Sequence, residues 1–150
     1  MVGLIQRVKE AEVWVEGECI SRIGEGILLL AGISRDDNMQ DAVYLAHKTA
    51  NLRIFSDKNG AMNLSLLDRG GEVLVVSQFT LLGDTRKGRR PSFTEAAPSA
   101  EAEVLYRALI DELKKLGIPV KEGKFQAIMD VKLINQGPVT IIINSKDHKT

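Results

Sequence analysis

Apolar and polar residues alternate along the first third of the chain in the way expected of β-strands. The stretch "AEVWVEGE" (11–18) alternates with a period of two, and "GILLLAGI" (26–33) is a continuous apolar run flanked by glycines. Alternation is typical of a half-buried strand, and a short bounded apolar run is typical of a fully buried one. Both stretches are therefore predicted to be strands.

Two other stretches have helical spacing. Residues 36–55 can be capped by Asp37 or Asn38, with an acidic residue in the first turn. Residues 100–117 follow Ser99 as a cap, with glutamates near their start and lysines near their end, an order that suits the helix dipole. The expected buried face of the first helix consists of Val43, Ala46, Ala50 and Ile54.

The remaining pattern predicts more strands and one long loop. A strand is expected at 72–82, two more at 120–135 (with an internal turn or bend) and 139–144, and a loop at 83–98. Strands outnumber helices, and the two classes do not alternate strictly. We therefore expect one α+β domain over residues 1–150, with mostly antiparallel sheets, barrel-like or in two layers, and two main helices packed outside.

Composition narrows the function classes. The chain has 150 residues, no formal net charge and a single cysteine, Cys19. A neutral protein attracts a polyanion only through a local patch, and no intrachain disulfide is available. Neither a secretory pattern nor an apolar run of membrane length is seen, so a cytoplasmic location is expected. Because no cysteine or histidine cluster has metal-ligand spacing, we expect no metal and no cofactor.

The tetrapeptide "SQFT" places Ser77, Gln78 and Thr80 at the end of a buried apolar strand. One interpretation is that the strand becomes polar where it leaves the core. The other is a site at the strand end, where free backbone N–H groups bind a ligand. A nucleophilic hydroxyl needs a nearby base, and none is close in sequence, so backbone donors of an oxyanion hole are the better-supported chemistry.

Two further motifs are open to a structural and a functional interpretation. The loop "TRKGRRPSF" is either a solvated charge run or a phosphate-binding loop, in which Phe93 stacks on a base or anchors the core. Gly137 and Pro138 stand against a β-branched run. Base rates favour a trans proline that opens a strand, although glycine permits unusual backbone geometry. The basic residues of the loop are Arg86, Lys87, Arg89 and Arg90.

The motifs together resemble the D-aminoacyl-tRNA deacylases, also called D-tyrosyl-tRNA deacylases. The likeness covers nearly the whole chain, from "QRV" to the last strand, and the pairing of "SQFT" with a downstream "GPVT" is its most specific part. This chain departs from common family residues at Leu82, Gln126, Ile128 and Gln136. The motifs that carry the resemblance are "NLRIFSD", "MNLSLLD", "EVLVVSQFTL", "DTRKGRRPSF" and "NQGPVT".

The resemblance implies hydrolysis of the ester of D-aminoacyl-tRNA, and of glycine on tRNA, by a homodimer with active sites at its interface. It implies that Gly137-Pro138 is a cis pair that enters the partner's site as a chirality gate, held by Arg7. The partner molecule is the 3′ end of a tRNA, with no role for DNA or a membrane. The other wall of the site is formed by Ser77, Gln78, Phe79 and Thr80, with Phe125, Ala127 and Met129 as a further pocket wall.

Two functions from other classes remain open on the sequence alone. The first is a non-catalytic RNA-binding module that uses the basic loop and Phe93. The second is a hydrolase for small esters or peptides, with Ser77 or Thr80 as its nucleophile. A structural dimer without activity leaves the polar strand end unexplained.

Overall fold

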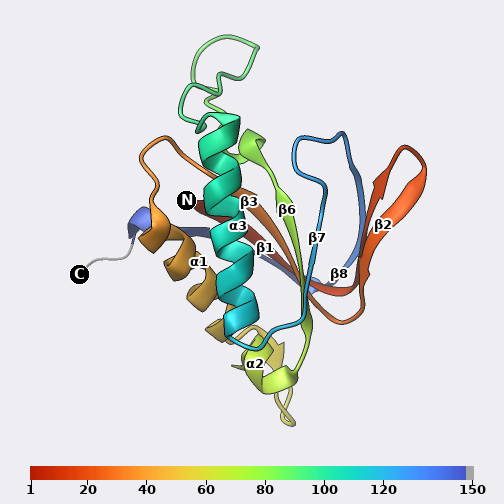
Figure 1. Cartoon of the computed structure of the whole chain (residues 1–150). Helices are drawn as coiled ribbons and strands as arrows, with labels where there is room; N and C mark the ends of the chain where they lie inside the picture. The colour runs from red at the N-terminus through yellow and green to blue at the C-terminus, as the bar shows by residue number, and fades with distance from the viewer. Residues whose placement is uncertain (148–150) are drawn as a thin grey trace.

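The computed structural model describes residues 1–147 (Figure 1). Its main sheet is built from β1 (Val2–Val15), β2 (Glu18–Ile23), β3 (Gly26–Gly32), β6 (Glu72–Ser77), β7 (Val120–Glu122) and β8 (Asp130–Asn144). A separate hairpin consists of β4 (Phe55–Ser56) and β5 (Met62–Leu64). The helices are α1 (Met39–Asn51), α2 (Leu66–Arg69) and α3 (Ser99–Lys115), with 3₁₀ turns η1 (Phe79–Leu82) and η2 (Ser145–Asp147).

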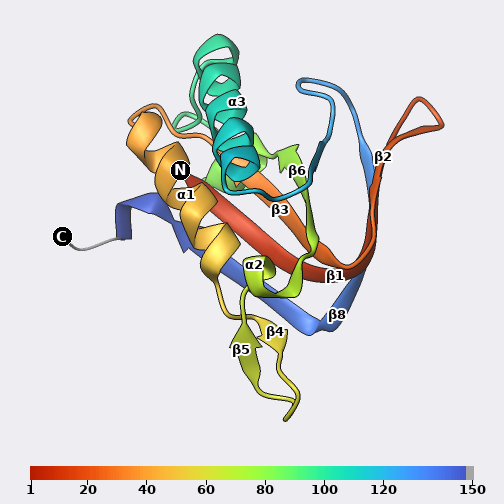
Figure 2. The ribbon, with the colours of Figure 1, turned by 60° about the horizontal axis from the view of Figure 1, so that its bottom comes forward.

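The sheet is organised around β1, the strand at its centre. Its first half pairs with β3, its second half with β2, and almost its whole length with β8, all antiparallel. The sheet curls so that β2 and the first half of β8 turn away from the helices, whereas the second half of β8 returns toward α1 (Figure 2). The predicted α+β class with mostly antiparallel pairing is confirmed. The exceptions are two parallel pairs, β3 with β6 and β6 with β7, in which the second strand follows the first through a helical crossover.

Apolar residues form one cluster on each face of the sheet. The larger cluster lies between the sheet and the pair α1 and α3, and includes Ile5, Leu29, Leu45 and Leu109. The smaller one lies inside the curl, around Val8, Val13, Leu74 and Val76. Because strand residues alternate between faces, one sheet supplies both clusters. No helix of the described residues is long and apolar enough to cross a membrane.

Helix α1 shows a prediction that was right about the element and right about most of its buried face. Asn38 caps the helix in a capping box with Asp41. The helix is shorter than the predicted 36–55, and of the expected buried residues Ala46, Ala50 and Ile54 are buried, whereas Val43 is 39% exposed. The buried residues of α1 are Asp41, Ala42, Leu45, Ala46, Thr49 and Ala50.

Other predicted boundaries need correction. The strand expected at 72–82 ends at Ser77, because the backbone then tightens into η1, with Leu81 N–H donating to the Gln78 carbonyl at 3.2 Å. The internal turn expected within 120–135 lies over 123–129, where Gln126 has a positive φ of 62°, and the separate strand expected at 139–144 is the second half of β8, which begins at Asp130. Ser99 is the first residue of α3 rather than its cap, which is Pro98.

A buried carboxylate joins α1 to the end of β8. Asp41 Oδ1 accepts a hydrogen bond from Ser145 Oγ at 2.6 Å. Its Oδ2 accepts from Lys146 Nζ at 2.8 Å and from the Asn38 backbone N–H at 2.8 Å. Burial alone raises the pKa of Asp41, but these hydrogen bonds outweigh it and lower the pKa from 3.8 to about 2.

This carboxylate gives a pH-dependent stability prediction. Asp41→Asn is expected to destabilise the protein by about 1–3 kcal/mol near neutral pH, because it breaks a buried charged network. The folded-state pKa is depressed, so the carboxylate's contribution is complete above pH 3.8 and is lost as the pH falls through about 2. Urea unfolding of wild type and variant at neutral and acidic pH measures this. The control is Asp36→Asn, since only the Asp36 backbone carbonyl contacts Lys146. A gap that stays constant down to pH 2 would contradict the assignment.

Candidate functional site

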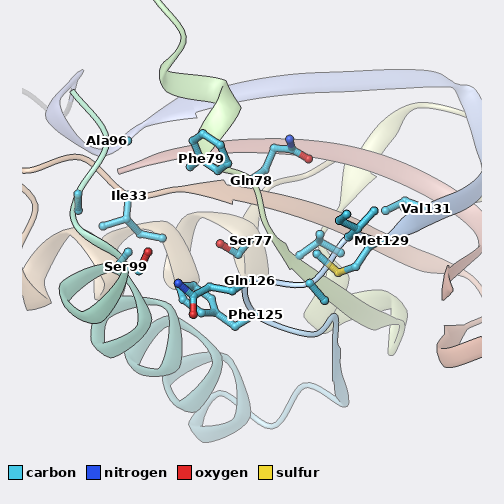
Figure 3. A pocket seen from close by; sticks show the side chains of 15 residues that line it. Ile33, Ser77, Gln78, Phe79, Ala96, Ser99, Phe125, Gln126, Met129 and Val131 are labelled. Carbon is cyan, nitrogen blue, oxygen red and sulfur yellow. The ribbon is translucent and has the colours of Figure 1, made fainter. Parts of the chain in front are cut away.

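A cavity of about 600 Å³ opens where β6 ends (Figure 3). Its walls come from the end of β6, the N-terminal part of α3 with the segment before it, and the loop 123–129. The lining residues are Ile33, Val76, Ser77, Gln78, Phe79, Ala96, Ala97, Ser99, Ala102, Phe125, Gln126, Ala127, Ile128, Met129 and Val131. None of them has a side chain that ionises near neutral pH. The cavity is therefore an apolar slot with a few neutral polar groups at one end.

The polar end of the cavity is the strand end "SQFT". Ser77 is the last residue of β6, and its hydroxyl points toward the cavity (Figure 3). The Gln78 side-chain amide donates to the Thr80 hydroxyl oxygen. Thr80 is exposed and lies beside the cavity lining rather than in it. The Thr80 oxygen therefore accepts a hydrogen bond, and its own proton remains available for donation.

Backbone donors lie at the same place. Phe79 and Thr80 are the first two residues of η1, so their N–H groups have no acceptor within that turn. The Gln78 N–H, by contrast, is bonded to the Ala31 carbonyl at 2.8 Å, which fixes the strand end to β3. The arrangement offers neutral donors on a fixed backbone, without a charged base among the cavity-lining residues.

The opposite wall is apolar and rigidly supported. The Phe125 ring packs on Tyr106 at a centroid distance of 5.6 Å, and the Tyr106 hydroxyl donates to the Val75 carbonyl at 2.9 Å. Burial raises the pKa of Tyr106, so this hydroxyl keeps its proton. Ala127 and Met129 continue the wall. A flat aromatic group such as a nucleobase fits a slot of this kind.

Gly137 and Pro138 lie elsewhere in the same chain. The peptide bond between them is cis, whereas base rates alone favoured trans. Both residues are exposed, and neither of them nor Arg7 lines the large cavity. Arg7 is paired with Ile27 on β3, and Ser77 with Ala31. These positions are four residues apart, or about 13 Å along the strand. A single chain therefore keeps the two motifs separate.

Arg7 holds the Gly137-Pro138 segment in place. Its Nε donates to the Gln136 carbonyl at 3.0 Å, and its Nη1 donates to the Ile54 carbonyl at 2.6 Å. Gly137 has a φ of +127°, and a Cβ added there would lie 2.6 Å from Arg7 Nη2. The position therefore admits only glycine without a shift of the arginine.

The basic loop is closed at its base, and only some of its cations are free of partners within the loop. Asp84 and Ser92 exchange backbone hydrogen bonds of 2.8 and 2.9 Å. Arg86 donates to both Asp84 carboxylate oxygens, at 2.9 and 2.7 Å, and these bonds lower the Asp84 pKa to about 2. The exposed cations of this loop for which the described residues provide no hydrogen-bond or ion-pair partner are Lys87, Arg89 and Arg90.

Phe93 connects the basic loop to the cavity. Its ring meets the Phe79 ring edge-to-face at a centroid distance of 5.1 Å. A Cβ added at Gly83 would lie 3.0 Å from the Phe93 ring, so the packing there is close. Phe79 is 56% exposed and Phe93 belongs to neither core cluster, so both interpretations of Phe93 from the sequence stay open.

Sequence reasoning missed the wall formed by α3. Ala96, Ala97, Ser99 and Ala102 line the cavity opposite the strand end. The available signal was the small-residue run "EAAPSAEA", which lets a helix start approach a strand without filling the space between them. In the part of the chain that the structure describes, no group of three or more acidic, histidine or cysteine residues is placed to hold a metal.

Comparisons of the sequence with known proteins all match one family. A sequence model of the family described as D-Tyr-tRNA(Tyr) deacylase matches residues 4–144. D-aminoacyl-tRNA deacylases of Thermodesulfovibrio yellowstonii and Thermoanaerobacter sp. are each 58% identical over 97% of this chain, covering 100% and 98% of those proteins.

Solved structures agree with the sequence matches. The c-Myc DNA unwinding element binding protein superposes with a TM-score of 0.91 at 42% identity, covering 96% of this chain and 98% of its own. A probable eukaryotic D-amino acid tRNA deacylase superposes with a TM-score of 0.80 at 17% identity, over 95% and 97% of the two chains. The second likeness shows the fold alone.

The contact between Phe93 and Phe79 yields a local stability prediction. Phe93→Ala is expected to raise amide hydrogen exchange over 79–83 about fivefold to tenfold, because it removes an aromatic pair worth about 1 kcal/mol. Phe93→Leu keeps an apolar contact, so its exchange rate should fall between those of the wild type and the alanine variant. Exchange in β1 serves as the internal reference. Unchanged exchange in η1 with the alanine variant would show that Phe93 does not hold this turn.

Proposed function

This chain belongs to the D-aminoacyl-tRNA deacylase family, a family of hydrolases, and from that premise we propose that it hydrolyses the ester joining a D-amino acid or glycine to the 3′-terminal adenosine of tRNA. The supporting observation is the cavity at the end of β6. It combines an apolar slot for a base with neutral backbone donors at one end, and no ionisable group lines it. The products are a free amino acid and tRNA, in the cytoplasm where tRNA is charged.

The chemistry relies on backbone donors rather than on a catalytic base. Water adds to the ester carbonyl carbon, and the carbonyl oxygen becomes an oxyanion that accepts hydrogen bonds from the Phe79 and Thr80 N–H groups. The bond to the ribose oxygen then breaks, and that oxygen takes up the proton that the attacking water loses. The neighbouring ribose hydroxyl of the tRNA positions the water. An aminoacyl ester is already labile, so a modest lowering of the barrier suffices.

Thr80 orients the reactants in this scheme. Its oxygen already accepts from Gln78, and its hydroxyl proton is free to donate to water or to the ester. A nucleophilic role requires a base to remove that proton, and none lines the cavity.

We further propose that the active form is a homodimer. On β1, Ile5 faces the helices, so Leu4 faces the opposite side, where it pairs with Leu30 and Ile142. Ile142 is 70% exposed, and Leu4 and Leu30 are partly exposed. An apolar strip across three strands suits a self-complementary contact with a second copy.

Such a dimer allows the two motifs to meet. Gly137 and Pro138 are exposed on the bend of β8, away from the cavity of their own chain. A two-fold contact through the β1–β8 face brings the bend of each subunit to the cavity of the other. The backbone there then contacts the substrate's α-amino group, and an L side chain collides with it. A D side chain points outward, and glycine has none, so both are accepted.

The basic loop supplies affinity for the acceptor end. Lys87, Arg89 and Arg90 project from a closed loop, and Phe93 after it packs on the cavity residue Phe79. Phosphates near the 3′ end therefore meet three cations beside the cavity of the same subunit. Arg86 contributes less, because Asp84 already occupies its guanidinium.

The chirality gate is tested by Gly137→Ala. The wild-type protein is expected to deacylate D-aminoacyl- and glycyl-tRNA and to spare matched L-aminoacyl-tRNA. The variant should lose at least about tenfold of its D activity and have a smaller D/L ratio, because the new methyl group displaces Arg7 or the bend.

Gly17→Ala is the matched control. It carries a similar backbone strain, with φ +81°, and its Cβ meets nothing within 4 Å. A Gly137→Ala protein with an unchanged rate and D/L ratio would remove the gate from the mechanism. A wild-type protein inert toward all three esters would remove the activity itself.

The role of Thr80 is tested by the pair Thr80→Val and Thr80→Ser. Loss of the hydroxyl is expected to lower kcat about 10- to 100-fold without abolishing turnover, since the backbone donors remain. Thr80→Ser should stay within a few-fold of wild type. Single-turnover deacylation measures the residual rate. Complete loss in Thr80→Val and Thr80→Ala, with capture of an acyl-enzyme in wild type, would assign the nucleophile to Thr80 instead.

A further inference from the structure

We propose that the β4–β5 hairpin (residues 53–64) of each subunit forms part of the tRNA-binding surface of the other subunit's active site. In this arrangement the hairpin contacts acceptor-stem phosphates of the tRNA whose 3′ end is bound across the interface. The proposal rests on the cross-subunit arrangement proposed above and extends it from the substrate's amino acid to its RNA.

The hairpin is physically connected to the Gly137-Pro138 bend. One guanidinium, that of Arg7, donates both to the Gln136 carbonyl and to the Ile54 carbonyl. Arg7, Phe55, Ser56 and Gln136 also line one small cavity of about 100 Å³. Because one guanidinium bonds to both segments, the position of the hairpin is linked to that of the bend.

The hairpin and the bend of β8 lie at the same end of the molecule (Figure 2), away from the basic loop. In Figure 1 the loop before α3, which contains the basic residues, lies at the far end. If the bend of one subunit enters the cavity of the other, its hairpin comes to the mouth of that cavity. The mouth is then bordered by the basic loop of its own subunit and by the hairpin of the partner.

The exposed charged side chains of the hairpin are mainly cationic. Arg53 and Lys58 of the hairpin are exposed, and Lys58 has no hydrogen-bond or ion-pair partner among residues 1–147. The hairpin's one carboxylate, Asp57, is occupied by hydrogen bonds within the turn. It accepts from the N–H groups of Asn59 and Ala61, at 2.8 and 3.1 Å, and these bonds contribute to its lowered pKa. The outer surface of the hairpin is therefore cationic.

The surroundings of the hairpin leave these two cations available. Asp68 lies near Arg53 but accepts hydrogen bonds from the Ser65 backbone and hydroxyl, at 2.8 and 2.7 Å. The neighbouring Glu25 is paired with Arg69 at 3.0 Å. Two cations on long side chains at the tip and base of a polar hairpin suit a phosphate backbone, which needs charge without base-specific contacts.

Mixed dimers test which active site each hairpin serves. The pocket of one subunit is blocked with Ser99→Trp, because Ser99 is exposed, lines the cavity and caps nothing. Ala127→Trp is a second choice if the first does not fold. The hairpin change is Arg53→Ala with Lys58→Ala. In arrangement one the open-pocket subunit carries the hairpin change, and in arrangement two the blocked subunit carries it.

Arrangement two is expected to raise KM for D-aminoacyl-tRNA about threefold to tenfold and to lower the salt slope of tRNA binding by about 2, with kcat unchanged. Arrangement one should match a mixed dimer with two intact hairpins. Lys48→Ala with Lys114→Ala, which removes two charges from the helices, is the control and should have no effect. Arg89→Ala with Arg90→Ala in the open-pocket subunit should weaken binding and reports the contribution of the basic loop.

Each other outcome overturns the proposal in a recognisable way. The opposite pattern assigns the hairpin to its own subunit. Equal KM values in both arrangements would show that the hairpin does not bind RNA. In that case the hairpin residue Met62, which is 59% exposed, would point to a protein partner instead. Gly137→Ala placed in the same two arrangements tests the premise separately. If that change acts within its own subunit, the cross-subunit arrangement fails, and the hairpin proposal fails with it for a different reason.

Discussion

The antiparallel ladder between β1 and β8 is the interaction on which the rest of the molecule depends. It runs from Val2 paired with Asn144 to Trp14 paired with Asp130, and it is interrupted opposite Arg7. Gln6 pairs with Thr140 and Val8 with Asn135, so the residues between 135 and 140 leave the ladder where β1 contributes Arg7 alone. That excess of chain is the bend, and Arg7, which has no partner on β8, is the group that bonds to it.

The same ladder determines which residues of the sheet face the core and which face outward. With the register fixed, odd positions at the start of β1 face α1 and α3, and even positions face outward. The outward apolar residues are therefore a consequence of the pairing that builds the core. Asn135 reinforces the bend locally, since its Oδ1 accepts from the Val139 N–H at 2.8 Å and its Nδ2 donates to Thr140 at 2.9 Å.

Local pattern predicted the elements better than the site. Strand β3, helix α1 and the loop before α3 follow from alternation, spacing and capping, which act within a few residues. The buried face predicted for α1 was wrong at Val43 because the packing of the sheet against the helix decides which stripe is buried. The polar residues Ser77, Gln78 and Thr80 mark the end of β6, but Leu81 and Leu82 continue the apolar pattern, so the strand was predicted to run to 82. The cavity depends on small residues of α3 that meet the strand only in three dimensions, and the separation of Gly137 from Ser77 follows from register.

Gln126 combines a conformational cost with a side chain in the cavity wall. With φ +62° it occupies the left-handed region, where a non-glycine residue costs of order 1–3 kcal/mol. A glycine at this place would avoid that cost. This chain instead keeps an amide at the mouth of the cavity, next to Ile128, which is 94% exposed. The rim of the cavity is thus a place where the protein has exchanged folding stability for side-chain chemistry, and where relatives can diverge without altering the strand end behind it.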